Sequence, residues 1–365
     1  MLLFEIWSLE GYLPESDLKC HDPFWRGVER QMRASIRRVE EVGDDIVLPT
    51  CWRVGWDIAA ADYGVPIRSH SAVDSQKGSV GFSFDHPIRT TEDLSKLRPR
   101  SWMVDREKTR RLVDRLGHAF GDILPIRLHG TTCLLAAMTQ DAFRLIGNDN
   151  LLTWPYDEPD ALHRLMAFLR DDRIAYYQWL EQEQLLGSNN NEIEVGSGSP
   201  GFTSALPPDG APGPVRRKDI WIWMESQETV CVSPAMFDEF FLPYMAEVAR
   251  PFGLVYYGCC EPVHDRWDRV IQQIPQIRAV SISPWCDMRI MAEKLGSTCV
   301  FSRKPPSGPI SGATPDWSAL EKDIDDTLDA ARGCNLEILY RDVYRINGDR
   351  PRLRRWVEMV REKIG

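Results

Sequence analysis

The stretch FGLVYYGCCEP, residues 252–262, decides how the rest of the chain is interpreted. Its first six residues form an apolar run that is typical of a buried strand. Two adjacent thiols and a carboxylate follow at the end of that strand. In barrels of parallel strands this end is the rim that carries catalytic residues. Thiolates are soft metal ligands, and a neighbouring carboxylate can complete a zinc site or move a proton.

Other apolar runs alternate with amphipathic segments along the chain. The runs that predict strands are Leu2–Trp7, Asp45–Leu48, Ile123–Leu128, Ile220–Met224, Leu254–Tyr257, Ala279–Ile282, Cys299–Phe301 and Leu336–Leu339. The segments that predict helices are Phe24–Val42, Asp160–Leu186, Ala235–Ala249 and Pro315 to about Ala331. Strands that alternate with helices predict an α/β protein with a parallel sheet.

Composition narrows the class of protein. The chain has 365 residues and a formal net charge of −10, which argues against a general binder of nucleic acid or of an anionic membrane. The first seven residues do not have the pattern of a signal peptide, and no uninterrupted apolar segment approaches the ~20 residues of a membrane span. Nine cysteines without a secretory signal predict reduced thiols in the cytoplasm.

The segment 187–215 is the least regular part of the chain. It is rich in Asn, Gly, Ser and Pro, and it is long for a loop in a compact domain. We expect it to be an active-site loop that closes over bound substrate. No firm domain boundary appears, so residues 1–365 are interpreted as one domain in which residues 1–120 hold an N-terminal elaboration and the first strands.

The Cys-Cys-Glu sequence at 259–261 allows two interpretations. Successive side chains of an extended segment point in opposite directions, so both thiols reach one metal ion only if the chain turns. Gly258 and Pro262 favour such a turn. The alternative is one buried thiol beside one reactive or idle thiol.

Polar residues also follow two other apolar runs near the candidate rim. Arg303 and Lys304 follow residues 298–301, where two cations suit a carboxylate or phosphate, or lower the pKa of a thiol; a solvated basic loop is the alternative. Glu225 follows Met224 and suits a general base or a ligand. Its alternative is a polar strand end.

Two further candidates stand at strand ends. His129 suits an acid, a base or a ligand, although a lone histidine is more often structural. Asp342 is expected to reach the centre of a barrel, and a structural pair with Arg341 is the alternative.

Several of these segments together resemble the uroporphyrinogen decarboxylase superfamily. They are IRLHG at 126–130, ESQET at 225–229, VSPAMFDEFFLPY at 232–244, YGCCEP at 257–262, SISPW at 281–285 and FSRKP at 301–305. The set is most similar to a largely uncharacterised branch with the YGCCEP motif. The resemblance implies a single (β/α)8 TIM barrel, here with an N-terminal helical elaboration, whose site lies at the carboxyl ends of the strands.

Two departures from the decarboxylase pattern argue against uroporphyrinogen as the substrate. Decarboxylases of the superfamily grip its propionates with a basic loop, and the matching segment here is Trp7–Glu15, where Glu10 replaces the arginines. A substrate with many carboxylates needs cations at that position. The aspartate that the decarboxylases carry in a second segment falls near residues 50–52 of this chain, where no carboxylate is in register.

The methyltransferases of the superfamily bind zinc through a His-x-Cys segment and a later Cys. The resemblance aligns that segment with Cys259 or Cys260, without the His, and the later Cys with Asp342. It therefore implies methyl transfer between a small methylated substrate or thiol and a corrinoid (cobalamin-type) carrier, free or on a partner protein. The expected zinc ligands are Cys259, Cys260, Glu261 and Asp342. The expected catalytic residues are Glu225, His129, Lys304 and Glu261, and the expected substrate contacts are Glu10, Gln227, Tyr257, Trp285 and Arg303.

Two other functions remain open at this stage. One is a cofactor-free decarboxylase or lyase in which Arg303 and Lys304 hold a small carboxylate. The other is a non-catalytic barrel that binds a corrinoid or a metabolite.

Overall fold

The computed structural model describes residues 1–6, 12–74 and 78–365, and within these ranges it describes the side chains of all residues except 6 and 72–80. The strands are β1 (Leu2–Ile6), β2 (Trp52–Gly55), β3 (Asp57–Ala60), β4 (Ser69–Asp74), β5 (Gly78–Phe84), β6 (Trp102–Asp105), β7 (Ile126–His129), β8 (Glu194–Gly196), β9 (Ser199–Pro200), β10 (Trp221–Met224), β11 (Leu254–Tyr257), β12 (Ile277–Ile282), β13 (Val300–Arg303) and β14 (Asn335–Val343). The helices are α1 (Pro23–Arg37), α2 (Arg106–Phe120), α3 (Met138–Asp157), α4 (Pro159–Gln182), α5 (Pro234–Phe240), α6 (Leu242–Ala249), α7 (Trp267–Gln273), α8 (Met288–Leu295), α9 (Gly308–Ser311), α10 (Trp317–Ala330) and α11 (Pro351–Ile364).

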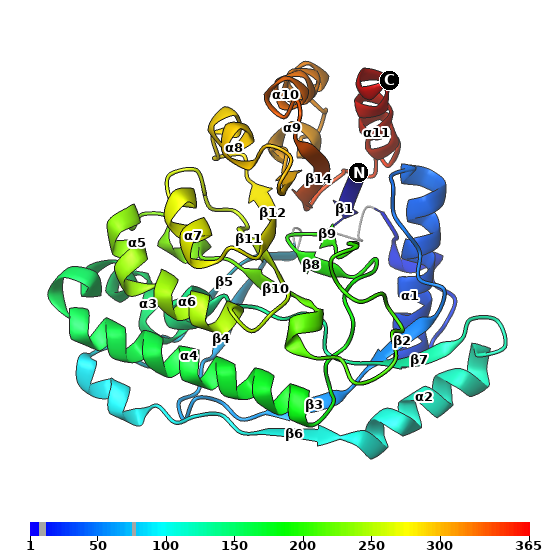
Figure 1. Ribbon diagram of the computed structural model, residues 1–365. Coiled ribbons are helices and arrows are strands. Elements are labelled where there is room, and N and C mark those ends of the chain that lie inside the picture. Colours follow the sequence, from blue (N-terminus) through cyan, green and yellow to red (C-terminus); the bar gives the residue numbers. More distant parts are fainter. Residues whose placement is uncertain (7–11, 75–77) are drawn as a thin grey trace.

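A curved six-stranded sheet, in the order β1-β14-β13-β12-β11-β10, forms the centre of the molecule (Figure 1). All of its neighbouring strands run parallel. β2 and β7 form a second parallel pair, and a bridge between Leu135 and Trp223 connects the segment after β7 to β10. The predicted α/β architecture with a parallel sheet is confirmed. In the described residues no ladder joins β1 to β2, so the sheet is an open curve and a closed (β/α)8 barrel is not established.

The free edge of β1 explains this opening. The backbone N–H groups of Leu2 and Phe4 donate to the carboxylates of Asp45 (2.7 Å) and Asp44 (2.8 Å). These side chains take the place of a neighbouring strand and satisfy the donors of the edge. The strand predicted at 45–48 is therefore wrong: this segment pairs with β1 mainly through side chains, and the strand forms later, at Trp52–Gly55.

Both faces of the central sheet are covered, which explains the continuous apolar strand sequences. All four residues of β11 are buried. The convex face packs against α4, α5 and α6, and the β1–β14 edge packs against α10 and α11 (Figure 1). On the concave face lies a smaller apolar cluster that includes Val195, Trp221 and Tyr256.

The irregular segment predicted as a closing loop contributes to this concave core. β8 and β9 form a short hairpin on the concave side of the sheet (Figure 1). The Asn189 side chain accepts from the backbone N–H of Trp221 (2.9 Å) and donates to the carbonyl of Trp221 (3.1 Å). Ser197 and Ser199 are buried. The first half of the segment thus packs against the concave face of the sheet, and only its second half, 202–215, follows the surface.

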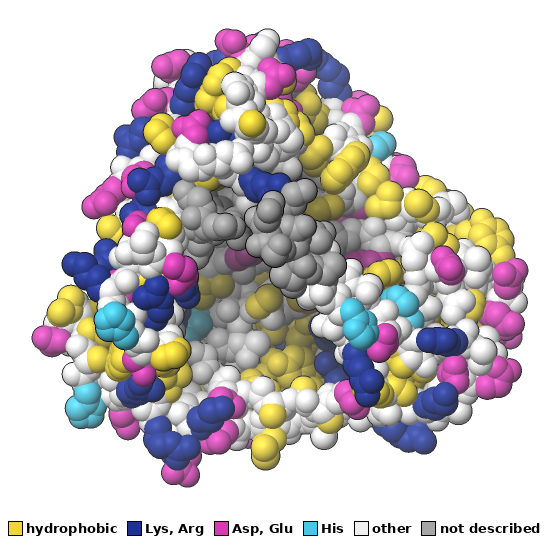
Figure 2. Space-filling view, turned by 180° about the vertical axis from the view of Figure 1, so that it is seen from behind, with side chains coloured by type: hydrophobic (Ala, Val, Ile, Leu, Met, Phe, Trp, Pro, Cys, Tyr) yellow, Lys and Arg dark blue, Asp and Glu magenta, His cyan; other side chains and the backbone are white. Residues whose placement is uncertain are grey.

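The N-terminal region is less helical than expected. Besides α1 and α2, it contains the antiparallel pairs β3–β6 and β4–β5. The two ends of the chain lie on the same side of the molecule (Figure 1). The opposite view shows a hollow in the middle of the molecule, with charges of both signs around it (Figure 2). Among the described helices, none is both long enough and apolar enough to cross a membrane.

Candidate active site

A pocket of about 510 Å³ lies at the carboxyl ends of β10, β11 and β12. Its walls are Gln227, Glu228, Val230, Cys260, Pro262 and Trp285. β10, β11 and β12 each end three residues before one of these wall residues, and the three strand ends lie at the same edge of the sheet. The structure therefore brings Gln227, Cys260 and Trp285 together at the predicted rim.

The loop after β11 turns sharply at Gly258, whose φ of +91° suits glycine and strains other residues. Glu261 then fixes the turn. One carboxylate oxygen accepts from the backbone N–H of Cys259 (2.9 Å), and the other accepts from Ser226 in the loop after β10 (2.8 Å). Glu261 is fully buried, and burial raises its pKa. Predicted as a catalytic residue and ligand, Glu261 is seen to clamp two loops together.

The turn brings the two thiols to the same side of the chain. The sulfurs of Cys259 and Cys260 lie 3.7 Å apart, and Cys260 forms part of the pocket wall. A hydrogen bond from the Cys259 thiol lowers the pKa of Cys260, and the same bond, together with burial, raises the pKa of Cys259. Cys260 is therefore the more acidic member of the pair, and it is the one that faces the pocket.

Glu225 is almost completely buried beside this pocket, at 2% exposure. Burial raises its pKa well above the usual value, and the nearby charges of Glu228 and Glu261 raise it further. One carboxyl oxygen accepts from the backbone N–H of Gln227 (3.2 Å), and the other, Oε1, has no hydrogen-bond partner among the described residues. This environment favours a neutral carboxylic acid that can donate its proton.

The spacing of the two thiols matches that of two ligands in a zinc site. Two thiolates on a tetrahedral zinc ion stand about 3.8 Å apart, given Zn–S bonds of about 2.3 Å. The separation of the Cys259 and Cys260 sulfurs, 3.7 Å, fits this geometry. Asp342, the more distant predicted ligand, is close enough for its charge to raise the pKa of Cys260. Within the described ranges no three His, Cys, Asp or Glu side chains converge as a metal site, so the thiols supply half of a tetrahedral set.

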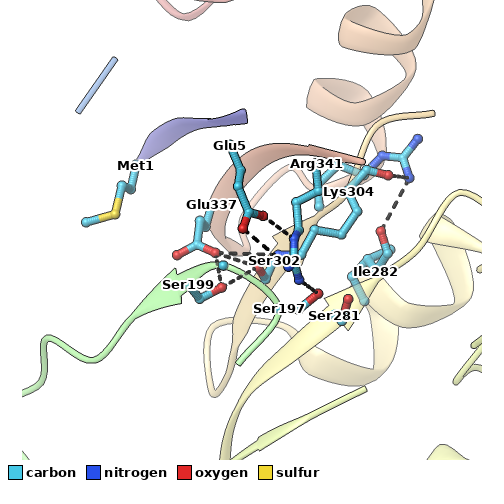
Figure 3. A network of polar contacts seen from close by, with 12 residues as sticks. Met1, Glu5, Ser197, Ser199, Ser281, Ile282, Ser302, Lys304, Glu337 and Arg341 are labelled. Carbon is cyan, nitrogen blue, oxygen red and sulfur yellow. Dashed lines mark hydrogen bonds and ion pairs between the residues drawn. The ribbon is translucent and has the colours of Figure 1, made fainter. Parts of the chain in front are cut away.

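Lys304 lies below the rim, in a buried polar network on the concave side of the sheet (Figure 3). Its ammonium group contacts the hydroxyl of Ser302 and lies 3.8 Å from the carboxylate of Glu337. Ser199, from the β8–β9 hairpin, donates to the same carboxylate. Lys304 was predicted to act on substrate, but it is not part of the pocket wall and instead connects the hairpin to β13 and β14.

Arg341 makes a second connection to the hairpin (Figure 3). Its guanidinium group pairs with Glu5 and donates to the hydroxyl of Ser197 (2.7 Å). The predicted alternative of a structural Arg341–Asp342 pair is thus replaced by a pair between β14 and β1. Asp342 adopts a φ of +58°, unusual for a residue other than glycine.

Three other predicted residues lie away from the pocket. Arg303 faces α10, where it pairs with Asp323 (2.6 Å). Tyr257 is fully buried, and burial together with the charge of Glu261 raises its pKa. His129 lines a separate pocket of about 460 Å³ under the 207–219 segment, and burial, followed by the charge of Arg53, lowers its pKa. Glu10 lies outside the described residues.

The sequence interpretation missed one polar wall residue, Glu228. Its carboxylate accepts from the hydroxyl of Thr139 at 2.8 Å. The position of Glu228 in the same loop as Glu225 and Gln227 was the available signal, but a residue in a loop cannot be assigned to a pocket without the path of that loop.

Comparisons with known proteins add a limited similarity. No family model matches the chain. Two curated uroporphyrinogen decarboxylases, from Mycobacterium sp. strains KMS and JLS, are 29% identical over 136 residues, which is 37% of this chain and 38% of each relative. A solved methyltransferase structure from Methanosarcina mazei aligns with a TM-score of 0.48 and 13% identity over 92% of this chain and 86% of that one. The two decarboxylase matches confirm the predicted resemblance, and the chain is similar to the uroporphyrinogen decarboxylase superfamily over a little more than a third of its length.

Proposed function

We propose that the pocket at the ends of β10, β11 and β12 is the active site of a methyltransferase. In this proposal, a methyl group moves between a small methylated substrate, or a thiol, and a corrinoid carrier that is free or held by a partner protein. In this proposal the curved sheet and the β2–β7 pair are two arcs of one (β/α)8-type barrel, in which catalytic groups gather at the carboxyl ends of the strands.

One observation carries the proposal: a paired thiol at the pocket wall lies near a buried carboxyl group whose pKa burial raises. Cys260 faces the pocket with Cys259 3.7 Å behind it. Glu225 is close enough for the charges of Glu228 and Cys260 to raise its pKa. Sulfur ligands can hold a metal ion, and a proton donor can protonate the oxygen or nitrogen atom that loses its methyl group.

Glu225 has the role of the general acid. When the bond between the methyl carbon and its oxygen or nitrogen breaks, the electron pair stays on that heteroatom. Glu225 gives its proton to this atom and becomes a carboxylate, which the pocket water then reprotonates. Because burial raises the pKa of Glu225, its neutral form, which can donate a proton, is favoured.

Cys259 and Cys260 are the residues that would hold a zinc ion, with Asp342 or a substrate atom among the remaining ligands. When bound, zinc supplies Lewis-acid polarisation of the methyl-bearing atom or of an acceptor thiol. Gln227 and Trp285 form the wall against which the substrate is oriented. The wall holds one carboxylate and, among its described residues, no cation, so it suits a neutral or cationic substrate better than an acid.

The test combines metal analysis with a methyl-transfer assay. The purified protein is incubated with reduced cobalamin and a panel of methyl ethers, methylamines and methyl thioethers, and methylcobalamin is followed by its absorbance. We expect turnover with one class, about one zinc ion per chain, and a ~10²–10⁴-fold lower rate in Glu225→Gln. Trace metal only, together with turnover that survives chelation, would exclude the zinc role. No methylcobalamin from any class would exclude methyl transfer.

The similarity to decarboxylases favours one alternative, a cofactor-free decarboxylase or lyase for a small carboxylate. In that case Glu225 would protonate a carbanion. Arg303 and Lys304, the cations expected to hold the acid, are engaged with Asp323 and Glu337. Carbon dioxide release without metal or corrinoid would support this alternative. Absence of both activities, together with a cellular function that survives Cys259→Ser and Glu225→Gln, would instead favour a non-catalytic binding role.

A further inference from the structure

The Cys259–Cys260 pair has a property that methyl transfer does not require. Its two sulfurs belong to neighbouring residues, and the turn at Gly258 places them 3.7 Å apart on one side of the chain. A disulfide bond requires ~2.05 Å, so the sulfurs need to approach by less than one further bond length. We propose that Cys259 and Cys260 form a dithiol–disulfide site that exchanges two electrons with small disulfides in the pocket.

Access from the pocket favours Cys260 as the sulfur that reacts first with a small disulfide. Cys260 forms part of the wall of the 510 Å³ pocket, which is large enough to admit a tripeptide disulfide end. Cys259 lies behind it, and its thiol is the hydrogen-bond neighbour of Cys260. All nine cysteines are free, and in the described part of the chain no other two cysteine sulfurs are in contact. The pair therefore combines an open thiol with a resolving thiol.

The exchange balances in two steps. The Cys260 thiolate attacks one sulfur of a small disulfide, forms a mixed disulfide and releases one small thiolate. That thiolate takes the proton of Cys259. The Cys259 sulfur then attacks the Cys260 sulfur, forms the ring disulfide and releases the second small thiolate, which takes up from solvent the proton that Cys260 gave up when it ionised. Overall, two protein thiols are oxidised by two electrons and one small disulfide is reduced to two thiols.

The ring disulfide is expected to be labile. Neighbouring Cα atoms stand ~3.8 Å apart across a trans peptide, below the range of about 4.4–6.8 Å that is usual for disulfides. Strained disulfides of this kind are reduced more easily than structural ones. While it lasts, the ring removes the one sulfur that faces the pocket and both sulfurs available to a metal ion. The oxidation state of the two thiols therefore decides whether the pocket presents a free sulfur and whether the pair can bind a metal ion.

The test uses the 365-residue chain as purified, without substrate, so it does not depend on methyl transfer. The protein is treated with oxidised glutathione, digested and examined by mass spectrometry, and released zinc is measured in parallel. We expect the 259–260 peptide to lose two hydrogens without retaining glutathione, and dithiothreitol to reverse this. Cys231 is exposed and has no sulfur in contact among the described residues, so it serves as an internal control that retains glutathione.

Two variants separate the steps. Cys259→Ser removes the resolving thiol, so Cys260 is expected to retain glutathione like Cys231. Cys260→Ser is the matched control and is expected to leave position 259 unmodified. If wild-type Cys260 keeps its glutathione, or if neither sulfur reacts while Cys231 does, the proposal is overturned. Differential alkylation of wild-type protein with light and heavy reagents gives the same answer if a variant does not fold.

Discussion

The carboxylate of Glu261 accepts the backbone N–H of Cys259 at 2.9 Å, two residues earlier in the chain. Its second oxygen accepts from Ser226 in the neighbouring loop at 2.8 Å. One fully buried carboxylate thus fixes the turn that brings the two thiols together and ties that turn to the loop that carries Glu225. The geometry of the thiol pair consequently depends on a side chain that never reaches the pocket wall.

The first prediction concerns this clamp. Glu261→Ala leaves two buried backbone N–H groups without acceptors, and each costs about 1–3 kcal/mol. Glu261→Gln retains one acceptor oxygen and is expected to lose about half as much. Urea unfolding measures the free energies. In both variants, the reaction of Cys260 with a small thiol reagent should also become slower or less selective over Cys231. Equal stabilities of wild type and Glu261→Ala would contradict the clamp.

The second prediction concerns the pH dependence of Glu225. Its folded-state pKa is raised above the unfolded value near 4.5, so its contribution to stability is fully present below pH 4.5. That contribution is lost as pH rises towards the folded pKa, at ~1.4 kcal/mol per pH unit. Glu225→Gln cannot ionise and should become more stable relative to wild type as pH rises from 4.5 to 8. Unfolding free energies at several pH values measure the difference.

Glu228→Gln is the control for this titration. It removes a like charge that raises the pKa of Glu225, so the window in which wild type loses stability should narrow. A Glu225→Gln curve that runs parallel to wild type at every pH would mean that Glu225 is ionised in the folded protein, and the general-acid role would then lose its basis.

The sequence predicted the parallel α/β class and the rim around 225–285 because strand ends and buried runs are local patterns. Gln227, Cys260 and Trp285 meet because each follows its strand by three residues. The face of the strand on which a side chain lies also explains why some of the predicted site residues lie away from the pocket. Arg303 belongs to the opposite face from Ser302, so it faces α10. The alternation of side chains along a strand predicts that Ser302 and Arg303 lie on opposite faces. The sequence alone does not show which of the two faces the interior of the curved sheet.

Other outcomes depended on partners that are distant in sequence. Lys304 follows the expected strand, yet its ammonium group turns back towards Glu337 and a hairpin more than a hundred residues earlier. The irregular composition of 187–215 indicated a loop, and composition cannot distinguish a loop over a site from a loop inside a curved sheet. Asp44 and Asp45, which terminate the sheet at β1, act through side-chain acceptors that strand patterns do not register.

The third prediction tests the packing of the β8–β9 hairpin. A Cβ atom at Gly196 would lie 2.2 Å from the ring of Tyr256, which is buried beneath it. Gly196→Ala is therefore expected to destabilise the fold by about 1–3 kcal/mol through overpacking, and to speed proteolysis within 187–215. Gly27→Ala in α1 is the matched control, because a Cβ there meets no atom within 4 Å. Unchanged protease resistance in Gly196→Ala would show that the hairpin does not lie against Tyr256.

The last prediction separates a structural Lys304 from a catalytic one. Lys304 and Glu337 are both buried, with 3.8 Å between the ammonium nitrogen and a carboxylate oxygen. Lys304→Met leaves the Glu337 charge without its buried partner, which typically costs about 3–5 kcal/mol. The double variant Lys304→Met with Glu337→Gln removes both charges, and it should regain much of the lost stability. Because Lys304 is absent from the pocket wall, the double variant should also regain, with the stability, whatever activity the wild type shows in the proposed methyl-transfer assay. A stable double variant without activity would return Lys304 to the catalytic residues.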